Sequence, residues 1–61
     1  MIYRIGEIVR VKNTDNLKLG VLGKVVGVEY NEELKERYYN VKLLDVNQKI
    51  ERYYSNALKK L

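Results

Sequence analysis

Tyrosine and basic side chains are the residues of this chain that could carry out recognition chemistry. The six tyrosines lie at positions 3, 30, 38, 39, 53 and 54, which gives two consecutive pairs. Consecutive side chains of a β-strand point to opposite faces of the sheet, so each pair sends one ring inward and one outward. We predict that Tyr39 and Tyr53 lie in the core, whereas Tyr38 and Tyr54 face solvent.

Each outward tyrosine would share its strand face with a basic residue, Tyr38 with Lys42 and Tyr54 with Arg52. Aromatic rings stack on unpaired bases while Lys and Arg hold the phosphate backbone, which is the usual chemistry of single-strand and RNA recognition. Tyr and Arg are also enriched at the centres of protein interfaces. A third interpretation is that the rings cover a thin core or a homodimer interface. The residue types alone leave all three interpretations open.

Basic residues outnumber acidic ones, and the two kinds are unevenly distributed. The chain has 12 Lys and Arg residues against 8 Asp and Glu residues, a net charge of +4. Residues 29–37 hold four of the acids and two of the bases, so the rest of the chain has ten bases, four acids and a net charge of +6. Such a surface attracts phosphate backbones or an acidic protein. We predict a weak, largely sequence-independent contact with RNA or DNA through Arg10, Lys12, Lys24, Tyr38, Lys42, Arg52 and Tyr54.

The residue types argue against catalysis. The chain has no Cys and no His, so it has no thiol nucleophile and no imidazole base or metal ligand. Ser55 is the only serine, and a catalytic serine needs a base and an orienting acid. The acids of 29–37 lack the spacing and turn glycine of a calcium loop, and the paired glycines are not followed by the Lys and Ser or Thr of a phosphate-binding loop. We predict a non-enzymatic protein with no catalytic residues, no cofactor and no metal site.

Length and hydropathy limit the chain to one small domain. A chain of 61 residues buries only about 60% of its unfolded surface, so we expect a single domain over residues 1–61 with a thin core. No apolar run exceeds four residues, which predicts neither a signal peptide nor a membrane span. Together with the absence of Cys, this predicts a soluble cytoplasmic protein without a membrane partner. Formation of a homodimer is left open.

The first strand and the glycines after it can be placed from their neighbours. Val9 and Val11 alternate with basic residues, which predicts a strand with one buried and one basic face. Short polar side chains then predict a long first loop through residue 18. Gly20 and Gly23 can each take a positive φ or allow another strand to approach closely.

The middle of the chain predicts a hairpin. Gly23 to Tyr30 is typical of a second strand, with a bulge at Gly27 where the sheet bends. Residues 31–37 are predicted as an exposed charged loop, with one helical turn capped by Asn31 as an option. The clearest alternation in the chain predicts a third strand over 38–43.

The last third of the chain fits two predictions. Apolar residues recur at helical spacing over 46–61, after a fair capping box formed by Asp45 and Gln48. Against this helix, residues 53–56 are four consecutive mediocre helix formers, and residues 45–48 suit a hairpin turn equally well. We favour a fourth strand over 49–54, a tight turn over 55–57 and a final strand over 58–61. The final strand would pair with the first strand and close a barrel.

The pattern of glycines and valines resembles that of a known family. The segments that carry the resemblance to the KOW motif are Val9-x-Val11 and Gly20-x-x-Gly23-x-Val25-x-x-Val28. The later Tyr39-x-Val41, Ile50, Tyr53 and Leu58 are similar to the second half of SH3-like barrels. The resemblance implies an all-β, five-stranded SH3-like barrel, and the alternative fold is a three-stranded sheet with a C-terminal helix over 46–61.

The same resemblance bears on the partner. KOW modules of ribosomal proteins and transcription elongation factors bind RNA or neighbouring proteins, and SH3-like barrels include protein adaptors and small subunits of larger complexes. Leu19 stands where a basic residue usually precedes the paired glycines. We therefore expect contact with RNA or DNA through the outward residues of the third and fourth strands, with a protein partner as the alternative.

Overall fold

Strands dominate the computed structural model, which describes residues 2–12, 20–45 and 47–61. In chain order the elements are β1 (Ile8–Val11), β2 (Leu22–Asn31), β3 (Glu36–Leu43), β4 (Ile50–Tyr54), the 3-10 turn η1 (Ser55–Ala57) and β5 (Leu58–Lys60). The described ranges contain no α-helix, so the alternative of a C-terminal helix over 46–61 is wrong. Ile and Tyr side chains pack well on a pleated surface, and here tertiary pairing outweighs the helical spacing of the apolar residues. The predicted first loop lies mostly outside the described residues.

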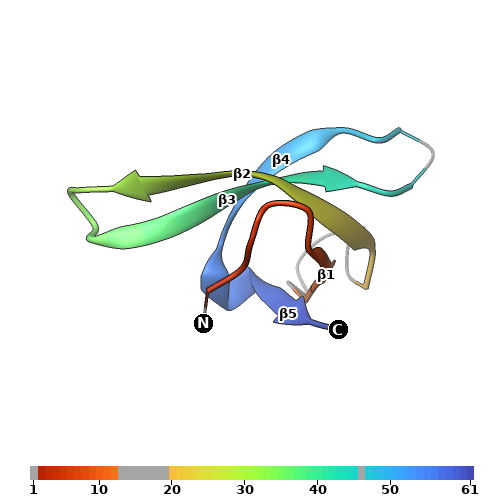
Figure 1. Cartoon of the computed structure of the whole chain (residues 1–61), viewed down its shortest axis with the longest axis horizontal. Coiled ribbons are helices and arrows are strands. Elements are labelled where there is room, and N and C mark those ends of the chain that lie inside the picture. Colours follow the sequence, from red (N-terminus) through yellow and green to blue (C-terminus); the bar gives the residue numbers. More distant parts are fainter. Residues whose placement is uncertain (1, 13–19, 46) are drawn as a thin grey trace.

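The five strands form one antiparallel sheet in the order β4-β3-β2-β1-β5 (Figure 1). β5 pairs with β1, with Arg10 opposite Lys59 and Val11 opposite Leu58. The predicted return of the last strand to the first is therefore confirmed. β4 and β5 are the two outer strands, and no ladder joins them within the described residues. The fold is all-β with an open five-stranded sheet, and closure into a barrel stays a prediction.

The hairpin of β2 and β3 is longer than the sequence predicts. β2 continues to Asn31 and β3 resumes at Glu36, so the loop spans 32–35 and not 31–37. Asn31 Oδ1 accepts a hydrogen bond from the Leu34 N–H (3.1 Å), which stabilises a tight turn, and no helical turn forms there. Figure 1 shows this hairpin projecting at one end of the molecule.

A short turn also joins β3 to β4. Asp45 Oδ1 accepts hydrogen bonds from the backbone N–H groups of Asn47 and Gln48, both at 3.0 Å. The Leu43 N–H donates to the Lys49 carbonyl oxygen across the base of the turn (2.8 Å). The hairpin interpretation of this segment is confirmed, because the Asp45 side chain bonds a turn and not a helix N-terminus.

The core lies on one face of the sheet. Tyr39 and Tyr53 are buried in it, as predicted. The inward positions alternate with outward ones along each strand, as the pleat requires. Among the described residues, the buried side chains are those of Tyr3, Val9, Val11, Val25, Tyr39, Val41, Leu43, Tyr53 and Leu58.

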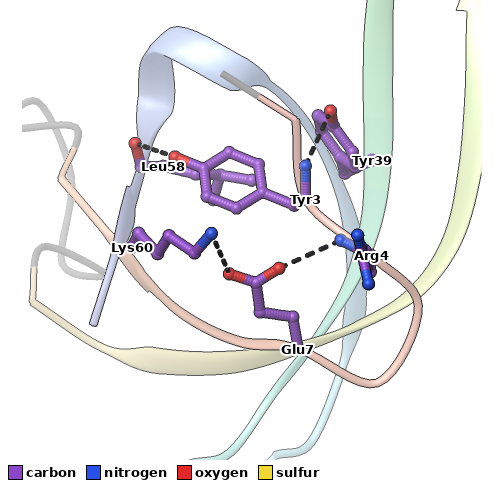
Figure 2. Close-up of polar contacts among 6 residues, drawn as sticks. All are labelled: Tyr3, Arg4, Glu7, Tyr39, Leu58 and Lys60. Carbon is purple, nitrogen blue, oxygen red and sulfur yellow. Dashed lines mark hydrogen bonds and ion pairs between the residues drawn. The ribbon is translucent and has the colours of Figure 1, made fainter.

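Tyr3 closes the core from the segment before β1 (Figure 2). Its ring packs edge-to-face against Tyr39, with centroids 5.2 Å apart. The Tyr3 hydroxyl donates to the Leu58 carbonyl oxygen (2.9 Å), and the Tyr3 N–H donates to the Tyr39 hydroxyl (3.2 Å). Burial raises the pKa of Tyr3 above its ordinary value. The sequence did not predict Tyr3 as a core residue, because it stands outside any alternating strand pattern.

Glu7 attaches this N-terminal segment to β5, as Figure 2 also shows. Its Oε1 accepts a hydrogen bond from the Arg4 N–H (3.0 Å), and its Oε2 lies 3.8 Å from Lys60 Nζ. The Lys60 side chain is well exposed, so the ion pair contributes little to stability. The hydrogen bond within the turn fixes the carboxylate in place.

Three glycines take the roles expected of them. Gly20 has a φ of +79°, which β-carbon sterics disfavour for other residues. At Gly23 a Cβ atom would overlap the Val41 side chain, so the absence of a side chain lets β2 and β3 approach. The register of β2 against β3 shifts between Val25 and Gly27, which confirms the predicted bulge.

Candidate functional site

The candidate site lies on the outer face of the sheet, which is the face opposite the core. Among the predicted contacts, Arg10, Lys24, Lys42, Arg52 and the ring pair of Tyr38 and Tyr54 all come from strand positions that alternate with core residues. Their cross-strand partners divide them into two groups. One group is basic, and the other is built on the two tyrosines.

The basic group spans four neighbouring strands. Lys24 of β2 lies directly opposite Lys42 of β3, and Arg10 of β1 lies opposite Lys59 of β5. Arg10 and Lys24 are diagonal neighbours across β1 and β2, since Ile8 pairs with Lys24. Diagonal side chains in a sheet are roughly 7–8 Å apart, within reach of one bound anion for long basic side chains. We call Arg10, Lys24, Lys42 and Lys59 the basic cluster.

Within the described ranges, the charges of the basic cluster have no partner carboxylate. No carboxylate in the described part of the chain forms an ion pair with any of its four members. Like charges placed directly opposite each other in a sheet are destabilising. A phosphate or another anion would relieve this repulsion, so the arrangement is suited to binding negative charge.

Arg10 is held in a fixed direction at one side of the basic cluster. Its Nη1 donates to the Gly20 carbonyl oxygen (2.9 Å). A guanidinium has five N–H donors, so the remaining donors stay available to a ligand. Lys12, also a predicted contact, follows β1 directly; its N–H donates to the Ala57 carbonyl oxygen (2.9 Å), and its side chain is exposed.

The second group lies on β2, β3 and β4, and we call it the tyrosine cluster. Its members are Glu29, Tyr38, Asn40, Arg52 and Tyr54. The Tyr38 and Tyr54 rings pack edge-to-face with centroids 5.8 Å apart. Arg52 Cζ lies 4.6 Å from the centroid of the Tyr38 ring, within the range of a cation–π interaction. One face of Tyr38 is therefore already covered, and both rings are half-buried.

Glu29 joins the aromatic and polar parts of this cluster. Its Oε1 accepts a hydrogen bond from the Tyr38 hydroxyl (3.1 Å), and its Oε2 accepts one from Asn40 Nδ2 (2.9 Å). The Asn40 bond, then the Tyr38 bond, lower the pKa of Glu29 below its ordinary value, and the same bond to Glu29 raises the pKa of Tyr38. The predicted nucleic-acid site thus contains an ionised carboxylate.

Sequence reasoning placed Glu29 with the acidic loop and left it out of the site. Simple alternation from Val25 would have turned Glu29 inward, but the bulge adds one residue before Gly27 and reverses the phase. The predicted bulge implies this reversal of alternation, so it is the feature of the sequence that could have identified Glu29 as an outward residue. Lys59 was also missed, although its alternation with Leu58 and the predicted pairing of the first and last strands point to it.

Asn31 extends the tyrosine cluster toward the end of the hairpin. Its Nδ2 donates to the Tyr54 hydroxyl (3.2 Å), which links β2 to β4 across β3. The ring of Tyr54 is thus fixed by a hydrogen bond at its hydroxyl and by the Tyr38 ring. The predicted site residues therefore lie on one outer face, but they do not form one uniform basic surface.

Two further observations concern metals and membranes. The described residues contain no group of three or more acidic side chains placed to hold a metal ion. They also contain no helix with the length and apolar character needed to cross a lipid bilayer.

The fold and this face define a small all-β domain built on a single antiparallel sheet. Comparison of the chain with protein-family models, with curated proteins and with solved structures finds no match.

Proposed function

We propose that this chain is a small non-enzymatic binding module that contacts the phosphate backbone of RNA or DNA through its outer face. The observation that carries the proposal is the basic cluster, in which Lys24 faces Lys42 and Arg10 faces Lys59 without a neutralising carboxylate among the described residues. Basic side chains that neutralise phosphates release counterions, and this release supplies most of sequence-independent affinity.

The strand order supports an SH3-like, KOW-like barrel as the proposed fold family. β1 pairs with both β2 and β5, and the remaining strands follow in a meander. This is the connectivity expected when the last strand returns to the first to complete a small barrel. The resemblance of the glycine and valine pattern to the KOW motif is the second argument for this proposal.

The tyrosine cluster gives the proposed interface a secondary contact. Arg52 covers one side of Tyr38, and Glu29 holds the Tyr38 hydroxyl, so stacking on a base is restricted to the parts of the two rings that remain accessible. We therefore assign affinity mainly to the basic cluster with Lys12 and Arg52 beside it. Tyr38 and Tyr54 would favour single strands over duplexes.

The proposal is tested by fluorescence anisotropy with labelled RNA, single-stranded DNA and duplex DNA over a salt series. Affinity is expected to fall steeply between low and physiological salt. The double variant Lys24→Gln, Lys42→Gln should reduce the slope of log affinity against log salt by about 2 for duplex DNA, because each lost phosphate contact removes about 0.9. Lys35→Gln, a single charge loss in the hairpin loop, should leave the slope near that of the wild type.

Substitution of both tyrosines gives a separate readout. Tyr38→Leu with Tyr54→Leu should weaken single strands more than duplexes, because only unpaired bases stack on the rings. An absent or salt-insensitive signal for all three nucleic acids contradicts the proposed function.

A protein adaptor or a small subunit of a larger assembly is the alternative. The projecting hairpin favours it, since Glu32 and Glu33 are exposed at its end and give it a charge opposite to that of the basic cluster. For a protein partner the sequence offers two contacts, the acidic loop over 31–37 and the first loop, and the first loop lies mostly outside the described residues. Recovery of one stoichiometric protein partner after nuclease treatment would favour this alternative, and the oligomeric state in solution would show whether the partner is a second copy.

A further inference from the structure

Among the described residues, one side of β2 has no partner strand over half of its length. β1 pairs with β2 only as far as Lys24. Val25 adds two backbone hydrogen bonds to the segment before β1. The Val25 N–H donates to the Glu7 carbonyl oxygen (2.9 Å), and the Val25 carbonyl oxygen accepts from the Gly6 N–H (2.7 Å). The chain turns at Gly6, which has a φ of +94°. Beyond Val25, no strand within the described ranges pairs with this side of β2. We call Val26–Asn31 the free edge.

The register shows which backbone groups of the hairpin face each neighbour. The Leu43 N–H donates to Lys49 O, so Leu43 faces β4, and by alternation Val41 and Tyr39 also face β4. Tyr38 and Asn40 alternate with these residues along β3, so their backbone groups face β2. The hydrogen-bonded pairs of β2 and β3 are thus those that involve Tyr38 and the residues at even spacing from it.

In β2, Glu29 lies opposite Tyr38 and Asn31 lies opposite Glu36, so these two residues point their backbone groups at β3. Val28 and Tyr30 alternate with them and direct their N–H and C=O groups to the free edge. No described residue forms a backbone hydrogen bond with these groups. An extended strand with unpaired donors and acceptors is a template for a further strand.

The side chains of the free edge differ between its two faces. Val28 is 38% exposed and Tyr30 is 56% exposed, and both lie on the core side of the sheet but beyond the core. Glu29 lies on the outer face. An added strand would therefore meet apolar side chains on one face and a carboxylate on the other.

Charge decides which strand suits this edge. Residues 29–37 carry four Glu against Lys35 and Arg37, so this end of the hairpin is net negative. Two copies of the free edge paired with Val28 opposite Tyr30 would place Glu29 opposite the same residue of the other copy, and like charges directly opposite are destabilising. A strand with Lys or Arg at its outward positions has the complementary charge.

We infer that the free edge of β2 binds an extended peptide segment in which basic and apolar side chains alternate. The backbone of the segment pairs with Val28 and Tyr30, its apolar side chains pack against these two, and its basic side chains lie beside Glu29. This surface is separate from the basic cluster, which would repel the same segment. The inference therefore stands independently of the proposed contact with nucleic acid.

The test uses the full chain, labelled with ¹⁵N, and a short synthetic peptide that alternates lysine with valine. The amide signals of Val28 and Tyr30 should shift most and gain protection from exchange. Val28→Pro removes one edge donor but no β2–β3 hydrogen bond, and proline is tolerated on an edge strand where its nitrogen faces solvent. We expect this variant to fold and to bind the peptide roughly tenfold more weakly. Val28→Thr keeps the N–H and the branched side chain, and should bind as the wild type does.

A second pair of measurements isolates the charge. The double variant Glu32→Gln, Glu33→Gln should weaken the lysine–valine peptide severalfold, and a glutamate–valine peptide should not bind the wild type. Failure of Val28→Pro to fold would place this N–H in the ladder and overturn the assignment. Equal affinity of Val28→Pro and wild type would do the same, as would self-association of the chain through Val28 and Tyr30 without the peptide.

Discussion

Glu29 sets the charge of the tyrosine cluster. Its carboxylate lies among Tyr38, Asn40 and Arg52 and takes hydrogen bonds from the first two. A negative charge at this position repels a phosphate backbone that approaches Arg52. The cluster is therefore less basic than its strand pattern suggests, and the outer face presents its strongest positive charge on β1, β2, β3 and β5.

Replacement of this carboxylate should separate its effects on binding and on stability. Glu29→Gln removes one negative charge, so RNA affinity in the anisotropy assay should rise severalfold at low salt and less at high salt. Glu32→Gln, with the same change of charge in the hairpin loop, is the control and should raise RNA affinity less. A fall in affinity for Glu29→Gln would mean that the carboxylate helps to orient the binding residues.

The lowered pKa of Glu29 also predicts a dependence of stability on pH. A carboxyl whose pKa is lower in the folded state contributes stability above its ordinary pKa, and that contribution is lost as pH falls through the lowered value. Thermal unfolding should therefore show wild type more stable than Glu29→Gln at neutral pH, with the difference closing in acid. A difference that stays constant down to the most acidic pH would contradict the hydrogen-bonded carboxylate.

At the scale of elements, β2 depends on the close approach of its neighbour at Gly23. A Cβ at this position overlaps the Val41 side chain and lies near the Lys42 carbonyl oxygen. Gly23→Ala should lower the free energy of unfolding by about 1–3 kcal/mol, since the added methyl group overpacks a filled site. Urea unfolding measures this loss.

The same contact can be tested by a double-mutant cycle. Val41→Ala makes room for the new methyl group, so the double variant should lose less stability than the sum of the two single changes. Additive losses would show that Gly23 is needed for a reason other than the Val41 side chain.

Alternation along the strands predicted much of this architecture. It located the elements, the core positions of Tyr39 and Tyr53, and the outward positions of Lys24 and Lys42. Alternation describes one strand at a time, however, and the pairing of strands distant in sequence decides which side chains meet. The opposition of Arg10 and Lys59 depends on such a pairing.

Other misses have equally local causes. The hairpin loop is shorter than predicted because Asn31 and Glu36 pair as strand residues despite their polarity. Tyr3 lies in a segment without regular structure, and only the three-dimensional fold brings it against Tyr39 and Leu58. A single tyrosine before the first strand carries no periodic signal that would identify it as part of the core.

At the scale of the whole molecule, charge is separated between the ends of the sheet. The basic cluster lies where β1, β2, β3 and β5 pair, whereas the acids of residues 29–37 lie on the projecting hairpin (Figure 1). Within the basic cluster, repulsion between paired bases opposes folding. The surface that is proposed to bind phosphate therefore costs the unbound protein some stability.

This cost predicts a response of stability to salt. Screening weakens repulsion between exposed like charges, so moderate NaCl should raise the melting temperature measured by circular dichroism. The double variant Lys24→Gln, Lys42→Gln should be more stable than wild type by about 0.5 kcal/mol at low salt, and the gain should vanish at high salt. A variant that is less stable than wild type at low salt would mean that the two lysines pack favourably and do not repel.

The bulge at Gly27 gives β2 two phases of alternation, one on each side of it. Deletion of Val26 would restore a single phase without changing any charged or aromatic residue. Glu29 would stay opposite Tyr38, and Val28 and Tyr30 would stay on the core side, because without Val26 the residues on both sides of the bulge pair one to one with β3. The bulge thus takes up one residue of chain length, and while Val26 is present it is the bulge that keeps Glu29 on the outer face and Val28 and Tyr30 on the core side.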